Sequence, residues 1–267
     1  MKCPACGFDN PQGMRFCGGC AAALERRCPG CGFENPPGFR FCGACATPLA
    51  PGAAAASWPA RSPGAYTPKH LADKILLSRS AIEGERKQVT VLFADIERSM
   101  ELAEVVDAEE WHRLLDGFFG ILTEGVHRFE GTINQFTGDG IMALFGAPIA
   151  HEDHAQRACY AALQLSERLR RYGEELKRTL GLGFSVRMGI NSGEVVVGAI
   201  GDDLRMDYTA QGHTVGLAAR MEQLAGADRV YLTEHTAGLV SGFLRLRDLG
   251  RFELKGAREP VRVYELE

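Results

Sequence analysis

The sequence has no long hydrophobic run and no excess of positive charge. No stretch approaches the ~18 uncharged apolar residues of a membrane-spanning helix, and no apolar segment of a signal peptide comes after Met1 to Pro4. The formal net charge of -4 and the pI of about 6.0 argue against the binding of nucleic-acid phosphates as the main function. Hydrophobic residues make up 45% of the chain and charged residues 24%, the balance of an ordinary soluble protein. We therefore expect a cytoplasmic protein.

Cysteine is almost absent beyond residue 45. Eight of the nine cysteines lie in residues 1–45, and Cys159 is the ninth. The eight form two copies of the pattern C-x2-C-x10-C-x2-C, which begin at Cys3 and at Cys28. In a cytosolic chain such a cluster indicates metal binding rather than disulfides, and two residues between thiolates direct both sulfurs toward one ion. The alternative is a disordered tail of reduced, unliganded cysteines.

The doubled spacing predicts two structural Zn²⁺ ions, each with four thiolate ligands. Each unit has too few apolar residues to bury a core, so zinc must supply the stability, on the order of 10 kcal/mol per ion. Four thiolates leave no open coordination position and hence no catalysis. Residues 1–50 resemble a double zinc ribbon, with the ligands Cys3, Cys6, Cys17 and Cys20 in the first ribbon and Cys28, Cys31, Cys42 and Cys45 in the second.

A linker and a short helix are expected in residues 51–85. The stretch from Pro48 to Pro68 is rich in proline and alanine, which is typical of a partly extended linker. From Lys69 onward, apolar residues recur at helical spacing. The predicted amphipathic helix either connects the ribbons to the next domain or packs against a partner's copy, with packing onto its own core as the alternative.

Residues 86–267 carry the pattern of one α+β domain, for which a mixed sheet with helices on one face is expected. The turn sequence Thr137-Gly138-Asp139-Gly140 predicts that the strands beside it form a hairpin. The domain has 21 Lys and Arg against 28 Asp and Glu, so any phosphate must be held locally, by metal and a few basic side chains. The predicted helices span 109–129, 151–177 and 215–224, and the predicted strands span 89–94, 132–136, 141–145, 184–190, 195–200, 230–232, 244–249 and 261–265.

Two acidic residues stand where they could bind a metal ion. Asp95 ends an apolar strand, and Asp139 lies in the hairpin turn between Gly138 and Gly140. A carboxylate at a strand end and another in an adjacent turn can converge on one cation, and hard oxygen ligands favour Mg²⁺ or Mn²⁺. The glycines would let a polyphosphate approach the backbone. The alternative is that Asp139 is an ordinary turn residue.

Five motifs, in their order along the chain, resemble the catalytic domain of the class III nucleotide cyclases. They are VLFADI at 91–96, FTGDGIMALFG at 136–146, RMGINSGEV at 187–195, DYT at 207–209 with TVGLAARM at 214–221, and LKG at 254–256. The resemblance covers essentially all of residues 86–267 and implies a ferredoxin-like cyclase fold. It also implies that a purine nucleoside triphosphate binds at the interface of a head-to-tail homodimer.

The resemblance assigns catalytic roles to four residues. Two Mg²⁺ or Mn²⁺ ions per active site would be held by Asp95, Asp139 and the carbonyl of Ile96. One ion would lower the pKa of the ribose 3′-hydroxyl, and both would neutralise the phosphates as pyrophosphate leaves. Arg220 would stabilise the charge that develops on the α-phosphate.

Substrate contacts are implied at four further positions. Ile96 to Met100, a turn that contains Ser99, would bind phosphate through its amides at a helix start. Lys255 would contact the terminal phosphate. The two base-selecting positions are Gln135 and Thr209, and threonine at the second is a familiar adenine-type choice.

The sequence departs from the family pattern at Gly216 and at Gln135. The family's transition-state asparagine lies one helical turn before Arg220, where this chain has Gly216. The loss of a contact to the ribose costs about 1.5–3 kcal/mol, or roughly 10- to 150-fold in rate. Gln135 replaces the base-selecting lysine, and an amide can face either adenine or guanine. We therefore expect a slow or regulated adenylate cyclase in intracellular signalling that uses ATP, with GTP as the other candidate substrate. The alternative is a degenerate cyclase domain that binds nucleotide or dimerises without turnover.

The ribbons and two remaining features are given other roles. Residues 1–50 have five basic and three acidic residues, and each tetrathiolate zinc site adds a charge of -2. This favours a regulatory protein partner over nucleic acid. His151-Glu152-Asp153-His154 is interpreted as the start of a helix rather than a metal cluster, and Cys159 as a small buried residue rather than a nucleophile.

Overall fold

The computed structural model describes two units of the chain. The described residues are 19, 26–27, 34–35, 67–69, 72–73, 86–200, 206–209, 213–254 and 259–267. Contacts divide the chain into the compact units Met1–Ala60 and Arg61–Glu267. In the first unit β1 (Arg26–Arg27) pairs with β2 (Glu34–Asn35) as antiparallel strands. The eight cysteines of the predicted zinc sites lie outside the described residues, so their ligation stays a prediction.

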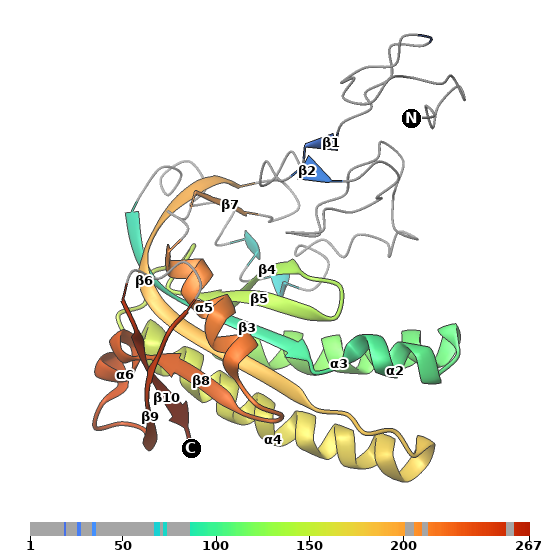
Figure 1. Cartoon of the computed structure of the whole chain (residues 1–267). Helices are drawn as coiled ribbons and strands as arrows, with labels where there is room; N and C mark the ends of the chain where they lie inside the picture. The colour runs from blue at the N-terminus through green and yellow to red at the C-terminus, as the bar shows by residue number, and fades with distance from the viewer. Residues whose placement is uncertain are drawn as a thin grey trace. The chain divides into compact units, whose positions relative to one another are not determined.

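The second unit contains a β-α-β-β-α-β arrangement, as the predicted ferredoxin-like fold requires. Strand β3 is followed by helix α3, a hairpin of β4 and β5, helix α4 and the long strand β6 (Figure 1). β3 pairs antiparallel with both β5 and β6 and is therefore an inner strand. The bounds of these elements are Arg86–Ile96 (β3), Ala108–Arg128 (α3), Thr132–Phe136 (β4), Gly140–Phe145 (β5), His154–Leu180 (α4) and Val186–Ile200 (β6).

The remaining strands extend the sheet beyond β6. The order across the sheet is β4-β5-β3-β6-β8-β10-β9, and β7 pairs with one end of β6. β8 runs parallel to β6 and the other pairs are antiparallel, so the predicted mixed sheet is confirmed. The bounds of the other elements are Ser99–Val105 (α2), Met206–Thr209 (β7), His213–Leu224 (α5), Val230–Thr233 (β8), Glu234–Val240 (α6), Leu246–Phe252 (β9) and Val261–Leu266 (β10).

Helices cover both faces of the sheet, so the expectation of helices on one face is wrong. On one face of β3, Thr90 Oγ1 shares a 2.7 Å hydrogen bond with His154 Nδ1 at the start of α4. On the other face, Val89 and Val91 pack in one apolar cluster with Ala218 of α5. Figure 1 shows α5 on the opposite side of β3 and β6 from α4. Both faces of β3 are apolar, and a second helix layer removes the second face from water.

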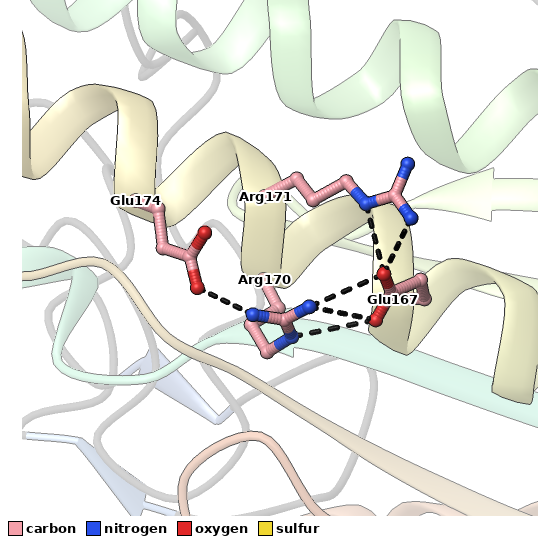
Figure 2. Close-up of polar contacts among 4 residues, drawn as sticks. All are labelled: Glu167, Arg170, Arg171 and Glu174. Carbon is pink, nitrogen blue, oxygen red and sulfur yellow. Dashed lines mark hydrogen bonds and ion pairs between the residues drawn. The ribbon is translucent and has the colours of Figure 1, made fainter.

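The outer face of α4 carries a network of charged side chains. Arg170 pairs with Glu167 at 3.0 Å and also with Glu174, and Arg171 pairs with Glu167 at 2.7 Å (Figure 2). Residues three and four apart lie on the same side of a helix, which permits these pairs. The opposite side of α4 is apolar and buried. No helix in the described part of the chain is both long enough and apolar enough to span a membrane.

β6 is one continuous strand, whereas the sequence predicted two strands separated near residues 191–194. The polar groups at that point stay in the ladder because groups of other elements satisfy their hydrogen bonds. Asn191 donates from Nδ2 to the carbonyl of Thr214 (2.8 Å). The Ser192 amide donates to Thr236 Oγ1 (2.8 Å). Both partners come from helices α5 and α6, far along the sequence from β6.

Other predicted elements agree with the structure to within a few residues at each end. The three predicted helices correspond to α3, α4 and α5, and the predicted hairpin to β4 and β5. Helix α6 was not expected. Of the helix predicted from Lys69, the described residues Lys69, Ala72 and Asp73 are helical, and Ala72 packs against the core of the second unit. Cys159 is fully buried, as expected, and burial raises the pKa of its thiol to about 12.

Candidate active site

The pairing of β3 with β5 brings the two candidate metal-binding carboxylates together. Asp95, near the end of β3, pairs in register with Gly140, the first residue of β5. The Ile96 amide donates to the carbonyl of Asp139 (3.1 Å), and the Thr137 amide donates to the carbonyl of Gly140 (2.9 Å). These bonds close the turn against the end of β3. Asp139 therefore sits beside Asp95, at one end of two inner strands.

Gly140 permits the close approach of the turn to Asp95. A Cβ atom at this position would lie 2.8 Å from Asp95 Oδ1 and would also overlap the carbonyl of Ala94. Gly138 has a φ of 102°, in the region that favours glycine. The two glycines that flank Asp139 are thus required by the shape of the turn itself.

The electrostatics of the pair suit a bound cation. Burial, and next the neighbouring carboxylates of Asp139 and Glu222, raise the pKa of Asp95 to about 7, while Arg187 opposes this shift. Asp95 Oδ1 is buried and has no hydrogen-bond partner. Ser99 at the start of α2 donates a hydrogen bond to Asp139 Oδ2. Two converging carboxylates with an orphaned oxygen fit a hard divalent ion such as Mg²⁺ or Mn²⁺.

Two charged residues at this site were missed by the sequence analysis. Arg187 at the start of β6 lies 3.5 Å (Nη2) from Asp95 Oδ2 and pairs through Nε with Glu222 of α5. Glu222 is almost fully buried, and burial raises its pKa, against the opposing effect of Arg187. Arg187 belongs to one of the five motifs but was given no role. Its position opposite Asp95 follows from the register of β3 against β6, which only the structure shows.

Among the remaining predicted site residues with described side chains, Gln135 and Arg220 form no described hydrogen bond or ion pair with the two carboxylates. Gln135 is exposed on β4 beside an irregularity in its pairing with β5. Within the described part of α5, Arg220 donates to Gln223 Oε1 (2.6 Å), and Gly216 precedes it by one turn. The backbone of Thr209 pairs with β6, and its side chain is outside the described residues, as is the whole of Lys255.

Comparisons with known proteins match both units. Residues 82–267 match the adenylate and guanylate cyclase catalytic domain, and residues 3–46 match the double zinc ribbon. Adenylate cyclase 1 of Rhizobium meliloti is 35% identical over 212 residues, which are 75% of this chain and 31% of that protein. The chain thus spans about a third of the length of this curated relative.

Two solved structures of similar proteins have the same fold. The adenylyl cyclase CyaB from P. aeruginosa is 31% identical, with a TM-score of 0.64, over 68% of this chain and 95% of that chain. The guanylyl cyclase Cya2 is 30% identical, with a TM-score of 0.62, over 69% of this chain and 93% of that chain. The chain therefore belongs to the class III adenylate and guanylate cyclase family, with a cyclase catalytic domain preceded by a double zinc ribbon.

Proposed function

We propose that this chain converts ATP to 3′,5′-cyclic AMP and pyrophosphate with divalent metal ions at the interface of a homodimer. The observation that carries the proposal is the convergence of Asp95 and Asp139, with Asp95 Oδ1 buried and unpartnered. Bound Mg²⁺ or Mn²⁺ would lower the pKa of the ribose 3′-hydroxyl and neutralise charge on the phosphates. The activity is slow or conditional, because Gly216 offers no side chain to the ribose.

In this proposal, the candidate site residues have specific roles. Asp95, Asp139 and the carbonyl of Ile96 hold the ions, and the hydroxyl of Ser99 fixes the orientation of Asp139 through its hydrogen bond. Arg220 stabilises the charge that develops on the α-phosphate. No described hydrogen bond or ion pair joins Arg220 to either carboxylate of the same chain, which favours a second copy as the source of this arginine.

The choice of ATP rests on two base-selecting positions. Gln135 is exposed on β4, where its amide is accessible to a base and both donates and accepts hydrogen bonds. Thr209 matches an adenine-type residue of the family, and two of the similar proteins above are adenylate cyclases. The similarity to the guanylyl cyclase Cya2 keeps GTP as the competing substrate.

The proposal is tested by product formation from each nucleotide. The purified chain is incubated with ATP or GTP and with Mg²⁺ or Mn²⁺, and cyclic AMP and cyclic GMP are quantified. We expect cyclic AMP from ATP, and we expect Asp139→Asn to abolish it. Asp153→Asn, which removes a carboxylate at the start of α4, is the matched control and retains activity. Absence of any cyclic product from the dimeric wild-type protein would overturn the enzymatic proposal.

A degenerate nucleotide-binding or dimerisation module is the second candidate, and Gly216 and Gln135 favour it. In that case Mn²⁺ and ATP together raise the melting temperature while no cyclic product forms. The double substitution Gly216→Asn with Gln135→Lys should then create activity. If these two replacements leave the chain inactive, the missing contacts are not what limits turnover.

We also infer that the zinc ribbons contact a regulatory protein rather than nucleic acid. Residues 1–50 have no basic stripe once the charge of two tetrathiolate sites is counted. The expected result is that the chain shifts no DNA or RNA probe at any salt concentration. Salt-sensitive binding to such a probe would contradict this inference.

A further inference from the structure

An arginine lies directly beside the candidate metal ligand Asp95. Asp95 and Arg187 are direct partners in the ladder between β3 and β6, so their side chains leave the sheet on the same face. Arg187 Nη2 lies 3.5 Å from Asp95 Oδ2, whereas Arg187 Nε pairs more closely with Oε1 of Glu222. The guanidinium is therefore held mainly by Glu222 and only loosely by Asp95.

The packing of α5 on β6 delivers Glu222 to this position. Gly189 lies two residues beyond Arg187 in β6 and on the same face. A Cβ atom at Gly189 would overlap the backbone of α5 at Ala218 and Glu222. The helix therefore rests directly on the backbone of the strand, and the side chain of Glu222 is almost fully buried there. Its exposed fraction is only 8%.

Because these charged groups are partly buried, the sum of negative and positive charge around Asp95 strongly affects metal binding. The exposed fractions of the Asp95 and Arg187 side chains are 23% and 28%. Charges in such surroundings interact more strongly than on an open surface. Among the described residues, Asp95, Asp139 and Glu222 are three carboxylates that interact with one another, and Asp95 and Glu222 also interact with the guanidinium of Arg187. The guanidinium of Arg187 can pair with Glu222 or with Asp95. The choice between these two partners determines how much negative charge remains to bind a cation.

We propose that Glu222 is a positioning residue that restrains Arg187 and so keeps Asp95 free to bind a divalent cation. This rests on the proposed function, because it takes Asp95 as a metal ligand. Without the charge of Glu222, Arg187 turns both Nη groups toward Asp95, since planar guanidinium and carboxylate groups favour two parallel hydrogen bonds. Asp95 Oδ1, which has no hydrogen-bond partner, accepts one of them. A divalent ion must then displace the guanidinium.

The test measures Mn²⁺ binding without nucleotide or turnover. Free Mn²⁺ is followed by its electron paramagnetic resonance signal during titration of the zinc-loaded full chain. We expect Glu222→Gln to weaken Mn²⁺ binding about tenfold, within the range of coupling between contacting residues. Adding Arg187→Gln to this variant removes the competing guanidinium and returns the affinity toward the wild-type value. Glu194→Gln, which breaks the exposed ion pair with Arg86, is the matched control and leaves binding unchanged.

Each outcome of the titration decides the question. The inference is overturned if Glu222→Gln binds Mn²⁺ as tightly as the wild type, or if the double variant binds as weakly as the single one. If Glu222 only supports the fold, the double variant is expected to bind Mn²⁺ as weakly as the single variant. If the wild type binds no Mn²⁺, the metal site of the proposed function falls as well, which separates the two failures. Should Glu222→Gln not fold by circular dichroism, Glu222→Asp replaces it; a smaller loss of affinity supports the inference, and wild-type affinity overturns it.

Discussion

At the scale of single residues, the absence of a side chain matters at two glycines for opposite reasons. Gly140 must lack a Cβ atom, because one would lie 2.8 Å from Asp95 Oδ1. Gly216 faces open space: among the described residues, no atom beyond its chain neighbours and the backbone of its own helix lies within 4 Å of the place that its Cβ would occupy. The first glycine therefore shapes the carboxylate pair. The second is a departure from the family pattern that the surrounding packing does not require.

The space at Gly216 makes a gain-of-function substitution feasible. Gly216→Asn is expected to raise the rate of cyclic AMP formation roughly 10- to 150-fold, because it supplies the missing side-chain contact to the ribose. The control is Gly216→Ala, which gives the helix up to ~1 kcal/mol of stability without an amide. Equal rates for the Asn and Ala variants would show that helix stability, rather than the ribose contact, limits the reaction.

The buried His154 is expected to make the free energy of unfolding depend on pH, separately from the metal site. Burial, followed by the smaller effects of His235 and His151, lowers the pKa of His154 from its usual 6.5, against the opposing effect of Asp153. The unfolded chain therefore binds a proton first as the pH falls. Stability is lost below pH 6.5 until the lower folded pKa is reached, with a maximum slope of about 1.4 kcal/mol per pH unit.

The measurement compares urea unfolding of the wild type and His154→Asn at pH 7.5 and at pH 5.5. Asparagine retains a polar group near Thr90 Oγ1, the partner of His154 Nδ1. We expect the wild type to lose more stability than the variant on acidification. The same loss in both proteins would assign the pH dependence to other groups.

At the scale of elements, the packing of helix α5 against strand β6 positions two parts of the candidate site: the residues beside the carboxylates and the residue expected to act on the nucleotide. Thr214 in the first turn of α5 donates to the carbonyl of Glu194 (2.9 Å), and Asn191 donates back to the carbonyl of Thr214. Further along, Gly189 lets the backbones of helix and strand touch. The same helix carries Arg220 and Glu222. A shift of α5 would therefore move the residues beside the carboxylates and those expected to act on the nucleotide.

The substitution Gly189→Ala tests this packing of α5 against β6. The added methyl group meets backbone atoms of α5 that cannot rotate away, so we expect a loss of about 1–3 kcal/mol in the free energy of unfolding. Gly238→Ala in α6 is the control. Its methyl group meets no described atom within 4 Å beyond the backbone of its own helix and its chain neighbours, so it should stabilise the protein by up to ~1 kcal/mol. Both variants are compared with the wild type by thermal and urea unfolding. An unchanged free energy of unfolding for Gly189→Ala would contradict the close packing of α5 against β6.

The sequence was sufficient for elements and contacts that depend on neighbours along the chain. The turn from Thr137 to Gly140 predicted its hairpin because glycine-flanked turn residues between apolar runs have few other conformations. The placement of Asp95 beside Asp139 followed from one strand end and one turn. Long apolar periodicity likewise predicted α3 and α4.

Features that depend on packing between distant segments could not be predicted in this way. The pair of Arg187 and Glu222 requires the register of β3 against β6 and the docking of α5, and neither is encoded locally. The break expected in β6 was wrong because a carbonyl of α5 and a side chain of α6 satisfy its polar groups. For the same reason the helix layer on the second face of the sheet was missed: periodicity identifies α5 but not the face that it covers.

At the scale of the whole molecule, the proposed active site is shared between two copies of the chain. The carboxylates lie at the end of β3 and in the turn before β5, whereas Arg220 bonds to Gln223 on its own helix. In a twofold symmetric dimer, residues from different surfaces of the two copies can meet at two equivalent sites. The proposed enzyme therefore takes its metal ligands from one copy and Arg220 from the other.

The most direct test of this shared site is complementation between two inactive variants. Asp139→Asn and Arg220→Ala are each expected to form dimers without making cyclic AMP. The two chains are then co-expressed with different tags, and the heterodimer is purified. It contains one site with both residues intact, so we predict about half of the wild-type activity. A heterodimer as inactive as either parent would contradict the shared site.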